Sequence, residues 1–185
     1  MKIKLYTKSY NKRILEKIDS KNDYFSSEEH SAASRLSYKN LDAICKERII
    51  NNYIVNNGIA LSQLKCVLEF IDQNKCKQIV SFGSGESVLE YLLSICLNES
   101  KLYAVDFDKF YIENGKKYLE HSNLTIDYFD FFSSKTDDLF NKHNIKPDLC
   151  IFFGSSYVLD DDDFIIFFNN LKKIGVKNVI DFYAG

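Results

Sequence analysis

The sequence lacks an excess of charge of either sign. Its 185 residues carry 24 Lys and Arg against 26 Asp and Glu, which gives a formal net charge of −2. A surface that grips nucleic acid or an anionic membrane needs a concentration of basic side chains. The composition therefore predicts a protein without a nucleic-acid partner and without affinity for membrane surfaces.

The sequence also has no long apolar run. The amino-terminal residues 1–6 do not form the apolar core of a signal peptide, and no uninterrupted apolar stretch approaches the length that spans a bilayer. The five cysteines include no C-x-x-C pair, which argues against a zinc site. Cys66, Cys96 and Cys150 lie in apolar patterns and are predicted to be buried free thiols. We expect a cytoplasmic protein with no bound metal.

The spacing of hydrophobic residues changes near residue 76 and divides the chain into two parts. Hydrophobic residues make up 45% and charged residues 27%, as in ordinary globular proteins, and 185 residues suffice for one core and a small appendage. Residues 1–75 show helical spacing without strands, including helices over 8–19, 40–55 and about 61–74. We therefore expect an N-terminal helical cap over 1–75 and a separate core over 76–185.

From residue 78 onward, short apolar strands alternate with helices. The pattern predicts strands at 78–82, 101–106, 124–129, 148–153 and 177–183, and helices at 86–97, 109–120, 136–143 and 162–173. Strands such as 149–153 are apolar on both faces, which is typical of a parallel sheet covered by helices. Five strands joined by four helices predict a doubly wound α/β fold with right-handed crossovers. The four adjacent carboxylates at 160–163 fit the start of the last helix better than a cation site.

The most informative segment follows the first of these strands. Gly83-Ser84-Gly85 separates the strand from a helix, and the second strand ends on Asp106, 21 positions after Gly85. The glycines let a ligand approach the backbone, the helix start offers free N–H groups, and the carboxylate can bind the two hydroxyl groups of a ribose. This segment predicts a crevice for an adenosine-containing cofactor.

Two residues argue against a dinucleotide as that cofactor. A dinucleotide fold places a third glycine where this chain has Val88, and its pyrophosphate lies at the helix start. Here Glu86 lies at the expected helix start, where its carboxylate would repel a pyrophosphate. S-adenosylmethionine carries no phosphate, and its sulfonium and ammonium groups are cationic. The acidic turn therefore favours S-adenosylmethionine over NAD.

With these features, residues 76–185 resemble the class I (Rossmann-like) S-adenosylmethionine-dependent methyltransferases. In that family the first strand runs into G-x-G-x-G, and this chain has Ser87 at the third glycine position. The family usually carries an acidic residue two positions before the first glycine, where this chain has Ser81. Glu86 is a candidate to replace the contact that this acid makes with the amino group of the cofactor.

The resemblance also assigns the strand ends. It implies that Asp106 binds the ribose, that Phe107 packs on the adenine, and that Asp130 lies near the adenine amino group with Phe131 as a stacking partner. The end of the fourth strand, at Phe153 and Gly154, faces the same crevice. The full set of predicted cofactor-binding residues is Gly83, Ser84, Gly85, Ser87, Asp106, Phe107, Asp130, Phe131, Phe153 and Gly154. His30 and Tyr157 are the candidates for a catalytic role, and no general base is assigned.

The resemblance implies strand order 3-2-1-4-5 and methyl transfer to a small-molecule acceptor by in-line displacement. Three alternatives stay open: transfer of the aminocarboxypropyl chain of the same cofactor, as in nicotianamine-synthase-like chemistry, a non-catalytic binding domain or fragment, and an NAD-dependent oxidoreductase. The family normally continues past strand five into a helix and two antiparallel strands. Without them, we expect the edge of strand five to be covered by the N-terminal helices, by a partner or by a second copy in a homodimer.

Overall fold

The fold is built on one parallel sheet. The computed structural model describes residues 46–182 except 57, 131–135, 157–158 and 160. The helix expected at 8–19 and the first residues of the helix expected at 40–55 lie outside the described residues. The strands are β1 (Gln78–Phe82), β2 (Lys101–Asp106), β3 (Leu124–Tyr128), β4 (Leu149–Phe152) and β5 (Asn178–Asp181). Their order is β3-β2-β1-β4-β5 with every pair parallel, which confirms the predicted doubly wound Rossmann-like sheet.

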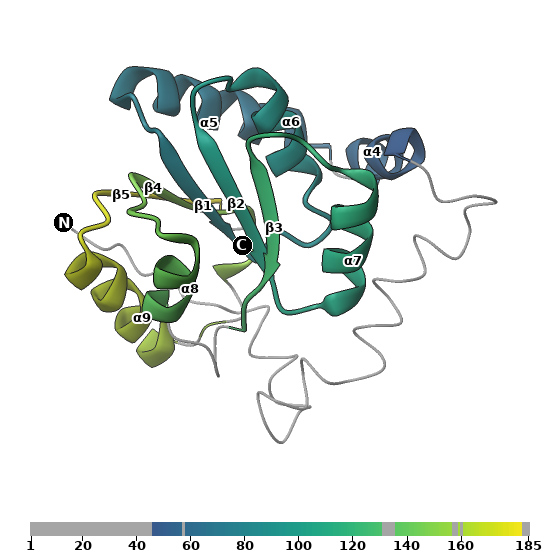
Figure 1. Ribbon diagram of the computed structural model, residues 1–185. Coiled ribbons are helices and arrows are strands. Elements are labelled where there is room, and N and C mark those ends of the chain that lie inside the picture. The colour runs from purple at the N-terminus through teal and green to yellow at the C-terminus, as the bar shows by residue number, and fades with distance from the viewer. Residues whose placement is uncertain (1–45, 57, 131–135, 157–158, 160, 183–185) are drawn as a thin grey trace.

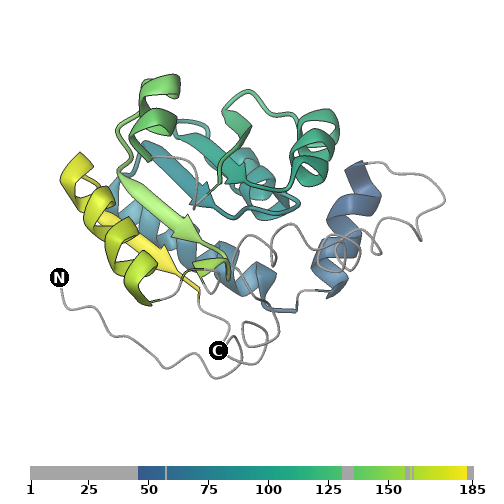
Figure 2. The same ribbon diagram turned by 90° about the horizontal axis from the view of Figure 1, so that it is seen from below.

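Helices cover both faces of this sheet (Figure 1). They are α4 (Lys46–Asn56), α5 (Ala60–Asn74), α6 (Val88–Cys96), α7 (Lys109–Tyr118), α8 (Thr136–His143) and α9 (Asp161–Ile174). The turned view shows α8 and α9 on the side of β4 and β5, well separated from α4 (Figure 2). None of the helices in the described part of the chain is long and apolar enough to cross a membrane.

The strand register explains why the strands are apolar on both faces. Val80 of β1 lies between Tyr103 of β2 and Cys150 of β4, and all three point toward the core under α8 and α9. The neighbouring residues of β1 and β2, Ile79 and Leu102, point the other way and join a cluster with α5 and α6. Parallel strands buried on two sides must therefore be apolar at successive positions.

The core under α9 is rich in phenylalanine. The ring of Phe82 lies 5.5 Å from that of Phe152 in a stacked arrangement, and Phe167 meets Phe82 edge-on at 5.1 Å. Phe129, which follows β3, also meets Phe82 edge-on, with 5.4 Å between the ring centres. These offset and edge-to-face contacts are the favourable geometries for aromatic pairs. They fix the end of β1, which leads directly into the glycine turn.

Helix α5 packs directly on the sheet. Its buried stripe consists of Ala60, Gln63, Val67 and Ile71, and the last two share a core cluster with residues of β1, β2 and β4. The predicted separation of residues 1–75 as a cap remains a prediction, because residues 1–45 lie outside the described part of the chain.

The prediction of three buried thiols was wrong for two of them. Cys66 and Cys96 are exposed, whereas Cys150 and Cys76 are buried. Cys66 is one position away from the buried stripe of α5, and Cys96 is the last residue of α6. An apolar neighbourhood in the sequence therefore did not place these two side chains on the inner face of their helices.

Strand β5 forms one edge of the sheet and pairs with β4 alone. Asn178, Val179 and Ile180 are half-buried, and Asp181 is exposed. The ring of Phe182 stacks in parallel on Phe153, with 5.4 Å between the ring centres. The partner or second copy expected to cover this edge stays a prediction.

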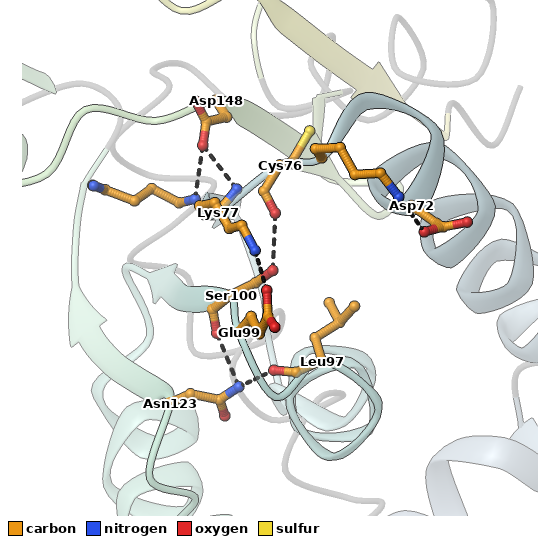
Figure 3. A network of polar contacts seen from close by, with 10 residues as sticks. Asp72, Cys76, Lys77, Leu97, Glu99, Ser100, Asn123 and Asp148 are labelled. Carbon is orange, nitrogen blue, oxygen red and sulfur yellow. Dashed lines mark hydrogen bonds and ion pairs between the residues drawn. The ribbon is translucent and has the colours of Figure 1, made fainter.

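Side-chain hydrogen bonds connect the strands at the end of the sheet where they begin (Figure 3). The Asp148 carboxylate, just before β4, accepts from the backbone N–H groups of Lys77 and Gln78 at 2.8 and 3.0 Å. Before β3, the Asn123 amide donates to the carbonyl oxygens of Ser100 at 2.9 Å and Leu97 at 2.5 Å. These bonds tie the starts of β1, β2 and β4 to their neighbours. The glycine turn lies at the opposite end of the sheet, where the strands end.

A second polar cluster fixes β3, the other edge strand. The Asp127 carboxylate forms ion pairs with Lys142 of α8 and with Lys116 of α7 at 3.6 Å, and one of its oxygens lies 2.8 Å from Nε2 of His143. Burial alone would raise the pKa of Asp127, but the hydrogen bonds from Lys142 and His143 outweigh it and lower the pKa to about 2. The cluster gives His143 a structural role at the end of its helix.

We predict that Asn123→Ala lowers the free energy of unfolding by about 2 kcal/mol, because it leaves carbonyl groups without their donor. Urea denaturation of wild type and variant measures this loss. Asn141→Ala is the matched control, since Asn141 is exposed on α8 and its loss should cost little. Equal stabilities of the two variants would contradict the role assigned to Asn123.

Candidate functional site

The glycine turn after β1 is bound to the end of β2. Gly83 and Gly85 adopt positive φ angles of 67° and 51°, the left-handed region that favours glycine. The backbone N–H groups of Gly83 and Ser84 both donate to the Val105 carbonyl oxygen, at 2.8 and 3.0 Å. The turn therefore lies beside the last residues of β2, where Asp106 stands.

Asp106 holds this turn and the next one together. One carboxylate oxygen accepts from the Gly85 N–H at 2.7 Å, and the other accepts from the Asp108 N–H at 2.9 Å. The side chain is 6% exposed. Burial raises the pKa of Asp106, and the backbone hydrogen bonds act in the opposite direction. Asp108 in turn accepts from the Phe110 N–H at 2.9 Å and so caps the start of α7.

The outer side of the turn is open at Gly85. A Cβ atom built on Gly85 would meet no atom within 4 Å. Its N–H donates to Asp106 and fixes the backbone at this position. The side on which a side chain would project carries no other atoms nearby. A ligand can therefore come close to the backbone here, as the sequence predicts for this glycine.

Ser87 faces the interior rather than a crevice. It is fully buried and has a φ of 56°, a conformation that is costly for a residue with a Cβ. Its hydroxyl lies 3.0 Å from the hydroxyl of Ser84 and does not cap helix α6. A Cβ built on Gly115 of α7 would lie 3.7 Å from the Ser87 hydroxyl oxygen. The serine at the third glycine position thus packs between the turn and α7.

The remaining predicted residues lie at the ends of β2, β3 and β4. Phe107 and Asp130 are half-buried just beyond β2 and β3. The Phe153 ring lies against Phe182 beside β5, and Gly154 has a φ of 76°. Because parallel strands all end at the same end of a sheet, the backbones at these positions lie at the end that carries the glycine turn. His30, Phe131 and Tyr157 lie outside the described residues and stay predictions.

The two serines after β4 make internal contacts. The Ser155 hydroxyl donates to the Phe82 carbonyl oxygen at 2.5 Å, and the Ser156 hydroxyl donates to an Asp181 carboxylate oxygen at 2.8 Å. These bonds link the loop after β4 to the ends of β1 and β5. Ser155 and Ser156 are therefore anchored to strands on both sides of β4.

A buried acid, Glu90, is the residue that sequence reasoning missed. It lies in the first turn of α6, is 1% exposed, and accepts a hydrogen bond from the Ser81 hydroxyl at 2.5 Å. Burial raises the pKa of Glu90 to about 7, the charge of Asp106 adds to the rise, and the hydrogen bond from Ser81 opposes it. The sequence held one signal, because Glu90 is the single charged residue in the helix Val88–Cys96.

The structure also revises the position of Glu86. Helix α6 begins at Val88, so Glu86 belongs to the turn and not to the helix start. The carboxyl group that contacts Ser81 is that of Glu90. The carboxyl group beside position 81 thus comes from the helix that follows the turn.

The arrangement suits a cationic ligand with hydroxyl groups. Two buried carboxyl groups, Glu90 and Asp106, lie behind the glycine turn, and Glu86 adds a third in the turn itself. Carboxylates attract cations and repel phosphates at short range. Within the described ranges, no group of three or more His, Cys, Asp or Glu side chains is placed to hold a metal ion.

Solved structures with this fold include methyltransferases. The plantazolicin methyltransferase BpumL in complex with SAH (S-adenosylhomocysteine) matches with a TM-score of 0.55 at 14% identity, over 80% of this chain and 56% of that one. BpumL with a pentazolic desmethylPZN analog and SAH gives 0.54 at 16% identity, over 81% and 57%. The match to an S-adenosylmethionine-dependent methyltransferase from Clostridium acetobutylicum ATCC 824 covers 62% of this chain and 45% of that one at 18% identity, with a TM-score of 0.48.

These matches confirm the resemblance at the level of the fold. The chain spans a little over half the length of BpumL. No family model matches the sequence, and no curated protein matches it.

We predict that Glu90 makes the protein less stable as pH rises. The pKa of its folded state, about 7, exceeds the ordinary value of 4.5, so folding favours the protonated form. Its stabilising effect is complete below about pH 4.5 and is lost as pH rises to about 7. At about 1.4 kcal/mol for each pKa unit, the loss amounts to about 3 kcal/mol. Urea denaturation from pH 5 to 8 should show this decline in wild type but not in Glu90→Gln.

We predict that Ser87→Gly is more stable than Ser87→Ala by about 1 kcal/mol, because only glycine relieves the left-handed backbone. Both variants lose the same hydroxyl group. Ser94, also buried in α6, is the matched control: there alanine should exceed glycine by about 1 kcal/mol, as in an ordinary helix. The same order at both positions, measured by urea denaturation, would contradict the strain assigned to Ser87.

Proposed function

We propose that this chain binds S-adenosylmethionine and transfers its methyl group to a small-molecule acceptor. The observation that carries the proposal is the bond between the Gly85 N–H and the Asp106 carboxylate at the ends of β1 and β2. It assembles a bare backbone turn and a carboxylate in a sheet of order β3-β2-β1-β4-β5. Proteins solved with SAH share this fold.

The charge of the site supports this cofactor class. Glu86 in the turn and the two buried acids Asp106 and Glu90 favour a ligand with cationic groups and no phosphate. NAD would bring a pyrophosphate to the same turn, against these three acids. A carboxylate at the end of β2 can also accept hydrogen bonds from ribose hydroxyl groups, since each oxygen of Asp106 uses one of its acceptor positions on the backbone.

The role of the protein in such a reaction is mainly to hold and align. The cofactor, when bound, supplies an electrophilic methyl group on its sulfonium. Gly85 allows the close approach, Asp106 fixes one end of the ligand, and the anchored loop after β4 borders the path of an acceptor. Alignment of two bound reactants can account for most of such a rate enhancement, so an assigned base is not required.

The identity of the product separates this proposal from transfer of the aminocarboxypropyl chain. Methyl transfer leaves S-adenosylhomocysteine, whereas aminocarboxypropyl transfer leaves 5′-methylthioadenosine. A non-catalytic domain would bind the cofactor and form neither. Residues 76–182 hold the described strands of the proposed cofactor-binding core, and the predicted catalytic candidates His30 and Tyr157 await a test of their own.

We predict micromolar dissociation constants, about −8 kcal/mol, for S-adenosylmethionine and S-adenosylhomocysteine, and no binding of NAD. Isothermal titration calorimetry of the whole chain measures all three. Gly85→Asp should abolish binding, because its side chain would fill the open space before the turn. Aspartate tolerates positive φ better than most residues, so the variant should fold.

Two controls sharpen this experiment. Gly58→Asp places the same side chain at another glycine with open space around its Cβ position, far from the turn in the sequence, and should retain binding. Unchanged affinity in Gly85→Asp would remove the turn from the site. Binding of NAD alone would replace the proposal by a dinucleotide-dependent activity.

A further inference from the structure

Two carboxyl groups are buried close together behind the glycine turn. Glu90 reaches the site from α6 and Asp106 from β2, and they are 1% and 6% exposed. Asp106 is held by two backbone N–H groups, which stabilise its carboxylate form. Glu90 has the hydroxyl of Ser81. Burial raises the pKa of both groups, and that of Glu90 reaches about 7, so Glu90 is partly protonated at neutral pH.

The elements packed on α6 bring no compensating cation to Glu90. Helix α5 contributes the apolar side chains Val67 and Ile71 to the cluster around α6. From α7 and β3 come Ile112 and Ile126. β1 contributes the uncharged Ser81 and β2 the acidic Asp106.

Helix α4, which also packs on α6, carries three charged side chains. The Lys46 ammonium lies over the Tyr91 ring at 4.2 Å, while Glu47 and Arg48 are exposed. In the described part of the chain, no Lys, Arg or His forms an ion pair with Glu90.

We propose that Glu90 is the counter-charge for the cationic part of the bound cofactor, and that binding releases the proton of its carboxyl group. The inference rests on the proposed function and adds to it a named residue and a coupling to pH. The step is an acid dissociation: the O–H bond of the carboxyl group breaks, the proton goes to solvent, and the carboxylate stays in the site. No covalent bond to the ligand forms.

Electrostatics supports the coupling. A positive charge placed within several ångströms of a buried carboxyl group favours its ionised form, and the effect is large where water is excluded. Burial holds the pKa of Glu90 at about 7, so the group is partly protonated at neutral pH. A cation bound at the turn would lower this pKa, and linkage then requires that lowering the proton concentration strengthens binding of the cation.

The test is calorimetric titration of the whole chain with S-adenosylmethionine near pH 6 and pH 7.5, each in two buffers of different ionisation enthalpy. Wild type should release close to one proton per ligand near pH 6, and its affinity should rise about tenfold by pH 7.5. Glu90→Gln should lose both effects. Protons released by the ligand itself are the same for both proteins and cancel when wild type is compared with the variant. Glu113→Gln, exposed on α7, should keep both effects.

A second ligand separates charge from shape. 5′-Methylthioadenosine has the adenosine and the sulfur but no cationic group, and it should bind without releasing a proton from Glu90. Proton release by wild type needs no variant, so the result does not depend on the folding of Glu90→Gln. Equal pH dependence in wild type and Glu90→Gln would overturn the inference while leaving the proposed function in place. Failure of wild type to bind either ligand would overturn the proposed function itself.

Discussion

The site depends on the double hydrogen bond that Asp106 makes with the backbone. By accepting from Gly85 N–H and Asp108 N–H, one carboxylate fixes the turn after β1 and the turn after β2. The bonds inside the turn, from Gly83 and Ser84 to Val105, act on the same segment. Bonds from backbone groups to a charged acceptor are among the stronger ones in proteins. Loss of this carboxylate would therefore loosen the turns after β1 and β2 as well as remove the proposed contact with the cofactor.

Most of the fold could be predicted from periodicity. The inner strands β1, β2 and β4 are largely buried on both faces, so they contain apolar runs such as Leu149–Phe152. The observed limits of the strands differ from the predicted ones by two residues at most. The glycine turn and Asp106 could be found because a left-handed backbone and a strand-end carboxylate leave a signal in the order of residues. These features depend on local structure, which the sequence expresses directly.

The features that could not be predicted depend on the direction of side chains. Glu90 looks like an ordinary acid in the first turn of a helix, and only the packing of α6 on β1 shows that it contacts Ser81. Ser87 stands at a position of the glycine motif, yet its side chain points into the interior. Phe153 follows β4 at the end of the sheet that carries the glycine turn, but its ring stacks on Phe182. In each case the backbone position was foreseeable and the contact was not, because contacts join residues that are distant in the sequence.

The exposed thiols have a practical consequence for any study of subunit composition. Cys66 and Cys96 are free and lie at the surface of α5 and α6, two helices on the same face of the sheet. Accessible thiols oxidise in air, and a disulfide between two molecules would yield covalent dimers on a non-reducing gel. Such dimers would have formed during storage and would not involve the edge strand β5. Sedimentation in the presence of a reductant, or of a chain with both cysteines changed to serine, separates the chemical artefact from genuine self-association.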